Sequence, residues 1–243
     1  MLNLLFGFYI ATRVIGELML ELLLYSFWLP FWKESALFVY YYLRKDPYAT
    51  MHQYLQEKES SEEPDSIQRE NFVYGPTPLS SLHYILRRSG VQKGAHIFDF
   101  GCGSGRGCLF MAKKWRSRVV GIDLNPYFIE TAQKIREKVE NESVTFIHGD
   151  ILSIDVRDAD LIYMYCTTWH QELLLRLAQK FERELHEGAR IITVSQTLPD
   201  TGSALILQDH FHANYLEGKR KVFVYRVSGP PDGHTPAAES PNA

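Results

Sequence analysis

The ten residues FDFGCGSGRG, at positions 98–107, constrain the fold of this chain more than any other segment. They consist of an apolar run that contains Asp99, followed by glycine at every second position from Gly101 to Gly107. Glycine-rich turns between a buried strand and a helix hold dinucleotides, phosphates or S-adenosylmethionine, because a turn without side chains lets a ligand approach the backbone. The pattern therefore predicts an α/β fold with a ligand at the end of its first strand.

The spacing of the glycines separates these three ligands. A dinucleotide site needs G-x-G-x-x-G, but the third glycine position is occupied by Arg106 or Cys108, depending on the frame. A phosphate-binding loop needs a Lys-Ser or Lys-Thr pair after its glycines, and none follows here. What fits is D-x-G-x-G-x-G, formed by Asp99, Gly101, Gly103 and Gly105. An acid at the strand end suits the ammonium of S-adenosylmethionine, which carries no pyrophosphate.

Two more acids stand where the next strands are expected to end. Asp123 closes the apolar run VVGID, 22 residues after Gly101, where its carboxylate can accept hydrogen bonds from ribose hydroxyls. Asp150 closes FIHGD and could accept from the adenine amino group. Ile151, which follows Asp150, is expected to cover the adenine ring, and Leu124, which follows Asp123, is a further cofactor-binding candidate. The carboxyl ends of parallel strands share one edge of a sheet, so the sequence predicts one S-adenosylmethionine site at that edge.

Strand-like and helix-like segments alternate at short intervals after residue 70, which predicts a doubly wound, mostly parallel sheet of seven strands. The last two strands are expected to pair antiparallel at the sheet edge. Strands are expected at 95–101, 117–123, 144–150, 159–166, 189–196, 204–212 and 219–227, and helices at 78–90, 106–115, 125–140 and 171–188. We expect one catalytic domain over 71–228.

The first 55 residues are expected to form an apolar, helical N-terminal extension. Arg13, Glu17 and Glu21 interrupt it, so its longest uncharged runs, residues 2–12 and 22–32, have 11 residues, against about 20 needed to span a bilayer. Two alternatives stay open: residues 1–43 lie on a membrane surface, or they pack on protein. We expect a polar linker at 56–70 and a disordered tail at 229–243.

Composition narrows the function classes further. A net charge of −3 gives no indication of nucleic-acid binding, which requires a dense basic surface. Cys102, Cys108 and Cys166 form no CxxC motif and have no histidine at metal-ligand spacing. We interpret them as reduced thiols of a cytoplasmic protein, with neither disulfides nor a bound metal.

At the level of motifs, FDFGCGSGRG, VVGIDLNP, FIHGDIL and DLIYMYC resemble, in the same order, those of class I S-adenosylmethionine-dependent methyltransferases, over about residues 70–227. The segments at 73–86 and 161–198 are also similar to non-SET protein-lysine methyltransferases of the disruptor-of-telomeric-silencing type. Tyr74, Gly75 and Thr77 match three positions of the YGET segment of that family. The resemblance implies that this segment, with Tyr74 and Thr77, closes over the cofactor. Pro76 replaces its glutamate, and Tyr165 and Cys166 replace its paired asparagines.

Residues after the fourth expected strand, together with Tyr74, are the candidates for the methyl-acceptor site. Aromatic faces suit a cationic amine, so Tyr74, Tyr165, Thr167 and Trp169 are the catalytic candidates, with Tyr165 also next to the cofactor. The leading interpretation is methyl transfer to an amine, such as a protein lysine. The alternatives are a small-molecule or lipid methyltransferase, a NAD-dependent oxidoreductase, and a non-catalytic interaction protein.

Overall fold

The computed structural model describes residues 31–44, 77–202, 204–215 and 218–228, together with Gly16 and Met19. Tyr74, most of the apolar N-terminal extension, the linker expected at 56–70 and the tail expected at 229–243 lie outside these residues.

Seven strands form one mixed sheet in the order β3-β2-β1-β4-β5-β7-β6, which confirms the predicted fold class. The first five are parallel, and β7 runs antiparallel to both β5 and β6. Because β6 is antiparallel to β7, it runs in the same direction as β5. The strands are β1 (His96–Phe100), β2 (Arg118–Asp123), β3 (Val144–His148), β4 (Leu161–Tyr165), β5 (Arg190–Val194), β6 (Leu205–Tyr215) and β7 (Gly218–Val227).

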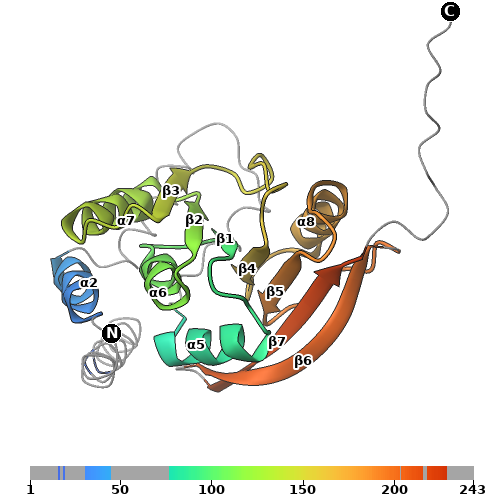
Figure 1. Ribbon diagram of the computed structural model, residues 1–243, viewed down its shortest axis with the longest axis horizontal. Helices are drawn as coiled ribbons and strands as arrows, with labels where there is room; N and C mark the ends of the chain where they lie inside the picture. The colour runs from blue at the N-terminus through green and yellow to red at the C-terminus, as the bar shows by residue number, and fades with distance from the viewer. Residues whose placement is uncertain are drawn as a thin grey trace, which may run out of the picture.

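The described helices cover the two faces of this sheet (Figure 1). Alternate side chains of a strand point to opposite faces, so Ile97 of β1 packs with α5, α6 and α7, whereas Phe98 and Phe100 pack with α8. The helices are α2 (Trp32–Arg44), α5 (Leu79–Arg88), α6 (Arg106–Trp115), α7 (Pro126–Lys138) and α8 (Gln171–Glu184).

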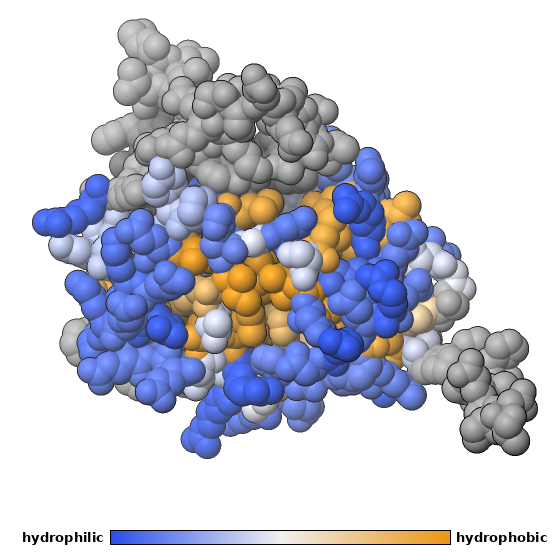
Figure 2. All heavy atoms as spheres, turned by 90° about the horizontal axis from the view of Figure 1, so that it is seen from above, coloured by the Kyte–Doolittle hydropathy of each residue, from blue (hydrophilic) through white to orange (hydrophobic). Residues whose placement is uncertain are grey.

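The second face has less helical cover than the first. The chain between β3 and β4 forms turns instead of a helix, so α8 and these turns cover β1, β4 and β5 on this side. Seen from above, the molecule shows apolar residues at the centre of one face, with hydrophilic residues on both sides (Figure 2).

Helix α2 packs on α6 and α7, next to the first face of the sheet. The ring of Phe31, just before α2, meets the ring of Phe110 edge-on, with centroids 5.7 Å apart. Lys113 of α6 donates to the buried carboxylate of Glu34 at 2.5 Å. Over its described residues, α2 therefore packs on α6 and α7, and most of residues 1–30, on which the two alternatives depend, lie outside the described part of the chain. No helix in the described part of the chain is long and apolar enough to cross a bilayer.

The strand directions decide where a site can form. The carboxyl ends of β1 to β5 lie at one edge of the sheet, and β6 ends at the same edge because it runs parallel to β5. Loops that follow strand ends at such an edge form the ligand crevice of open α/β sheets.

Candidate functional site

The glycine-rich turn connects the end of β1 to the start of α6. The backbone N–H groups of Gly101 and Cys102 donate to the carbonyl of Ile122 on β2, at 2.8 and 3.0 Å. Gly101, Gly103 and Gly105 all have positive φ, between 54° and 78°. At Gly105 a Cβ would lie 2.3 Å from the ring of Phe146, so no other residue fits there without displacement. At the three predicted glycines the turn therefore carries no side chain that would cover its backbone.

Asp99 lies on β1, two residues before the first glycine of this turn, and its side chain points to the face covered by α5 and α6. Its side chain is buried, and its Oδ2 accepts a hydrogen bond from the Cys108 thiol of α6 at 3.2 Å. Burial raises the pKa of the Asp99 carboxyl to about 7, and the nearby charge of Asp123 adds to the rise. No cation among the described residues acts on this acid, so it is in a poor environment for a negative charge, which a cationic ligand would improve.

Asp123 ends β2 and holds the glycine turn from the other side. Its Oδ2 accepts from the backbone N–H of Gly103 at 2.8 Å, and its Oδ1 accepts from the N–H of Asn125 at 2.8 Å. Burial raises the pKa of this carboxyl to about 6. Each carboxylate oxygen has a second lone pair, so both can still accept from a ligand. Leu124, the next residue, is joined to β3 through a hydrogen bond between its carbonyl and His148 at 3.0 Å.

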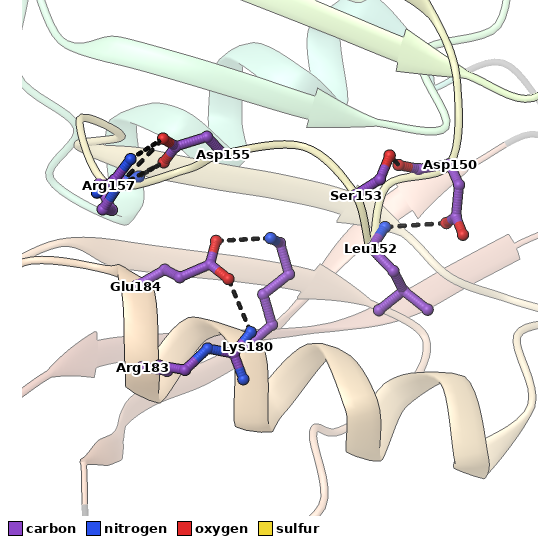
Figure 3. Close-up of polar contacts among 8 residues, drawn as sticks. All are labelled: Asp150, Leu152, Ser153, Asp155, Arg157, Lys180, Arg183 and Glu184. Carbon is purple, nitrogen blue, oxygen red and sulfur yellow. Dashed lines mark hydrogen bonds and ion pairs between the residues drawn. The ribbon is translucent and has the colours of Figure 1, made fainter.

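Asp150 is exposed, and its side chain turns back on its own loop (Figure 3). Oδ1 accepts from the backbone N–H of Leu152 at 2.9 Å, which fixes the turn after β3. The loop remains beside the site, because Gly149 N–H donates to the carbonyl of Asp123 at 3.1 Å. Ile151 is buried in the apolar cluster of the second face. Figure 3 also shows Asp155 and Arg157 of this loop near the polar end of α8.

A second group of side chains lies at the same edge, around β4. Tyr163 is the register partner of Asp99 on the neighbouring strand. Its hydroxyl is 3.1 Å from the Thr77 hydroxyl and 3.4 Å from that of Tyr215. Burial raises the pKa of Tyr163 well above its usual value, so its hydroxyl stays protonated. Thr77 thus attaches the segment before α5 to the sheet beside Asp99.

The predicted Tyr165 ends β4, and its ring stacks on that of Tyr215 at the end of β6, with centroids 5.1 Å apart and planes inclined by 24°. Both rings are half-buried. Sequence reasoning missed Tyr215, because the expected strand stopped at residue 212 and β6 continues for three more residues. The alternation FHANY, with Phe211 and Ala213 buried, was the signal that could have extended it.

Gln196, which follows β5, was also missed. Its side-chain amide donates to the backbone carbonyls of Cys166 at 2.7 Å and Trp169 at 2.8 Å. It thereby fixes the loop after β4 that carries the predicted Thr167 and Trp169. A hydrogen-bonding side chain in a loop after a strand has no distinctive sequence pattern, so this role is visible in the structure alone.

Thr167 and Trp169 take different positions in this loop. The Thr167 hydroxyl is half-exposed and lies 3.2 Å from the hydroxyl of Ser195. Trp169 is buried, and its indole contacts the glycine turn, where a Cβ on Gly101 would lie 3.4 Å from Cζ2. The structure therefore brings Asp99, the glycines, Asp123 and Trp169 into one group, with Tyr165, Thr167 and Thr77 next to it. Tyr74 lies outside the described residues.

Comparison with known proteins shows which family the chain resembles. A family model described as the ANTKMT methyltransferase domain matches residues 99–204, from Asp99 to the start of β6. The chain belongs to the class I S-adenosylmethionine-dependent methyltransferases. Its sheet order is typical of these methyltransferases, and their cofactor is S-adenosylmethionine.

Individual methyltransferases show how far the similarity extends. A protein-lysine N-methyltransferase of Saccharolobus islandicus is 28% identical over 128 residues, which is 49% of this chain and 74% of that protein. A sterol 24-C-methyltransferase of Yarrowia lipolytica is 28% identical over 109 residues, 44% of this chain but only 29% of that protein. The fold matches an RNA methyltransferase from Salinibacter ruber in complex with S-adenosyl-L-homocysteine, with a TM-score of 0.54 and 21% identity, over 65% of this chain and 97% of that one.

Proposed function

We propose that this methyltransferase acts on an amine, and that the acceptor is a lysine side chain of a protein. The observation that carries the proposal is the aromatic and hydroxyl cluster of Tyr163, Tyr165 and Tyr215, which adjoins Asp99 at the carboxyl edge of the sheet. The similarity to the protein-lysine N-methyltransferase of Saccharolobus islandicus supports the same acceptor.

The residues at the edge suit the cofactor. When bound, S-adenosylmethionine supplies a methyl group on a positively charged sulfonium. On this proposal, the buried Asp99 carboxylate accepts from the amino group of the cofactor, and the glycine turn lies against its amino-acid tail. Asp123, which still has free lone pairs, binds the ribose hydroxyls. Leu124 and Ile151 flank the adenine, and Asp150 lies at its rim with one carboxylate oxygen free.

The other half of the edge is proposed to bind the acceptor. Tyr74 and Thr77 close the site from the segment before α5, and the hydroxyl contact of Thr77 with Tyr163 gives that segment a fixed attachment. The rings of Tyr165 and Tyr215 offer aromatic surface to an amine, and burial of the amine among such rings favours its loss of a proton before transfer. Thr167 supplies a hydroxyl that can orient the amine nitrogen, and Trp169 holds the glycine turn in place.

A lipid-like or small-molecule acceptor is the second candidate. It is supported by the similarity to a sterol 24-C-methyltransferase and by the apolar character of residues 1–30.

Transfer from a radiolabelled cofactor separates these candidates. Purified full-length protein is incubated with a lysate and S-adenosylmethionine labelled in its methyl group, and label is measured in protein bands and in an organic extract. We expect label in protein, which acid hydrolysis releases as methyllysine. Label confined to the extract would replace the lysine proposal by the lipid one. The variant Asp99→Asn serves as the control without transfer.

We also propose that residues 71–228 act as the catalytic unit in the cytoplasm, and that the N-terminal residues bring it to a membrane surface. The basic Lys33 and Arg44 of α2 are both exposed and could face anionic lipids. Flotation of the full chain with vesicles containing about 30% anionic lipid tests this, since each basic residue near such a surface contributes about 1 kcal/mol. Flotation that is unchanged by Leu20→Glu with Leu24→Glu would contradict it.

A further inference from the structure

We propose that the buried thiol of Cys108 positions the Asp99 carboxylate for the amino group of the cofactor. The inference rests on the proposed function, because it takes Asp99 as the group that binds the amino-acid tail.

The geometry places the thiol where it can orient this carboxylate. Cys108 is the third residue of α6, its side chain is fully buried, and its Sγ lies 3.2 Å from Asp99 Oδ2. The same oxygen is confined by the backbone of α6, since a Cβ on Gly107 would lie 3.4 Å from it. Cδ2 of Leu82 on α5 would also lie 3.4 Å from this Cβ. In the part of the chain that the structure describes, the thiol of Cys108 is the one hydrogen-bond donor to this carboxylate.

The space for the thiol is built into the neighbouring strand. At Gly121 of β2, the register partner of Asp99, a Cβ would lie 2.8 Å from the Sγ of Cys108 and 2.9 Å from the Sγ of Cys102. Any larger residue at Gly121 would push both thiols from their positions. Cys108 thus lies beside Cys102 of the glycine turn, whose own thiol donates to the carbonyl of Gly103 at 3.5 Å.

The hydrogen bond has a defined electrostatic effect. Burial raises the pKa of Asp99 to about 7, and the thiol of Cys108 lowers it from the value that burial alone would give. Three other titratable groups face Asp99: Asp123 from the end of β2, Cys102 from the glycine turn and Tyr163 from β4. Burial raises the pKa of both thiols, so they remain protonated donors at neutral pH.

Two substitutions at Cys108 should shift the pKa of Asp99 in opposite directions. Cys108→Ala removes the donor, so the pKa of Asp99 rises and the carboxylate is lost at a higher pH. Cys108→Ser replaces S–H by O–H, a stronger donor to a carboxylate, so the pKa falls. A residue with a merely structural role would shift the pH dependence in the same direction for both variants, or not at all.

The experiment compares two ligands that differ in the amino-acid tail. Calorimetric titration of the full chain between pH 5 and pH 7.5 measures the affinities for S-adenosylhomocysteine and for 5′-methylthioadenosine, which lacks the tail. The ratio of the two affinities isolates Asp99, because Asp123 is proposed to contact the ribose that both ligands share. An α-amino group has a pKa of about 7.7–8.0 and titrates alike in every variant, so the shift between variants, rather than the midpoint of one protein, reports on Asp99.

We expect the ratio for the unmodified protein to rise with pH, with a midpoint near 7. The midpoint should move up by about 0.5 pH unit in Cys108→Ala and down by a similar amount in Cys108→Ser, roughly a threefold change in the ratio at fixed pH. Asp99→Asn should abolish the pH dependence. The buried thiol of Cys166, which donates to the carbonyl of Val194 at 3.3 Å, provides the matched control, and Cys166→Ala should leave the midpoint in place.

Shifts in the same direction for both variants, or no shift, would overturn the role of Cys108 while the cofactor site stands. Absence of binding by both ligands would instead remove the proposed site itself. Circular dichroism checks that each variant is folded, and if Cys108→Ala is not, a downward shift in Cys108→Ser decides the question alone.

Discussion

The side-chain amide of Gln196, after β5, donates at 2.8 Å to the backbone carbonyl of Trp169, in the loop after β4. One side chain thus joins the ends of two neighbouring strands at the edge where the cofactor is proposed to bind. Trp169 in turn contacts the glycine turn at Gly101, so the order of the turn depends on a residue nearly a hundred positions away.

Replacement of Gln196 should therefore impair both stability and turnover. Gln196→Ala removes the hydrogen bonds to the carbonyls of Cys166 and Trp169, which costs about 1–3 kcal/mol of unfolding free energy. We expect kcat/KM for methyl transfer to fall about tenfold, since the loop carries Thr167. Urea unfolding and initial rates measure the two effects. Gln171→Ala is the control, because its exposed amide donates to Gln196 Oε1 and, among the described residues, to no other group, and a loss of equal size there would contradict the role of the loop contacts.

Loss of the Asp123 carboxylate should weaken cofactor binding. Asp123→Asn removes a charged acceptor of ribose hydroxyls, and hydrogen bonds to charged groups contribute about 1.5–3 kcal/mol, so affinity should fall roughly 10-fold to 100-fold. Calorimetric titration with S-adenosylhomocysteine measures this. Asp155→Asn, at an exposed residue paired with Arg157, should retain the original affinity within about twofold. Equal binding by Asp123→Asn and the unmodified protein would remove the ribose assignment.

Gly105 should be intolerant of any side chain. Gly105→Ala places a Cβ 2.3 Å from the Phe146 ring, at a backbone φ of 78°. Steric overlap and backbone strain together should lower the free energy of unfolding by about 3 kcal/mol, measured by urea denaturation. Gly94→Ala is the matched control, since Gly94 also has positive φ but no atom within 4 Å of its Cβ position. A loss no greater than that control would show that Phe146 yields easily.

The buried acid Asp99 should make the free energy of unfolding depend on pH. Asp99 has a pKa of about 7 in the folded chain, against about 3.9 in the unfolded chain. Its protonated form therefore adds its full stabilisation to the folded state below about pH 4, and this stabilisation is lost as the pH rises to 7. Each unit of difference corresponds to about 1.4 kcal/mol. Asp99→Asn should therefore be more stable than the unmodified protein at pH 7, and the difference should shrink toward pH 4. Thermal unfolding without cofactor across this range measures it, and a constant difference would argue against the raised pKa.

The contact of α2 with the catalytic domain should depend on one buried charge pair. Lys113→Ala leaves the Glu34 carboxylate, whose side chain is 6% exposed, without its cation, which should cost about 3 kcal/mol. Lys134→Ala breaks a pair of the same 2.5 Å length with Glu130, but both side chains there are about half exposed, so the cost should stay below about 0.5 kcal/mol. Urea unfolding compares the two, and similar losses would contradict the buried role of Glu34.

More of the fold and of the proposed cofactor site than of the proposed acceptor site could be predicted from the sequence. Glycines, strand-end acids and alternating apolar runs are local patterns, so the mostly parallel sheet of seven strands and the position of Asp99 just before the turn could be predicted from them. The stacking of Tyr215 on Tyr165 depends on how far β6 continues and on how the sheet twists, which no short pattern encodes. The same holds for Gln196 and for the thiol of Cys108, whose contacts join residues brought together only by folding.

Because β6 runs in the same direction as β5, Tyr215 at the end of β6 lies at the edge of the sheet where the carboxyl ends of the parallel strands meet. The β6–β7 hairpin has no described contact with the glycine turn. If Tyr165 and Tyr215 bind the acceptor as proposed, lengthening, shortening or resurfacing this hairpin should change the choice of acceptor and leave cofactor binding unchanged. Relatives that share the β1–β3 half but differ in this hairpin are where divergence in acceptor should be sought.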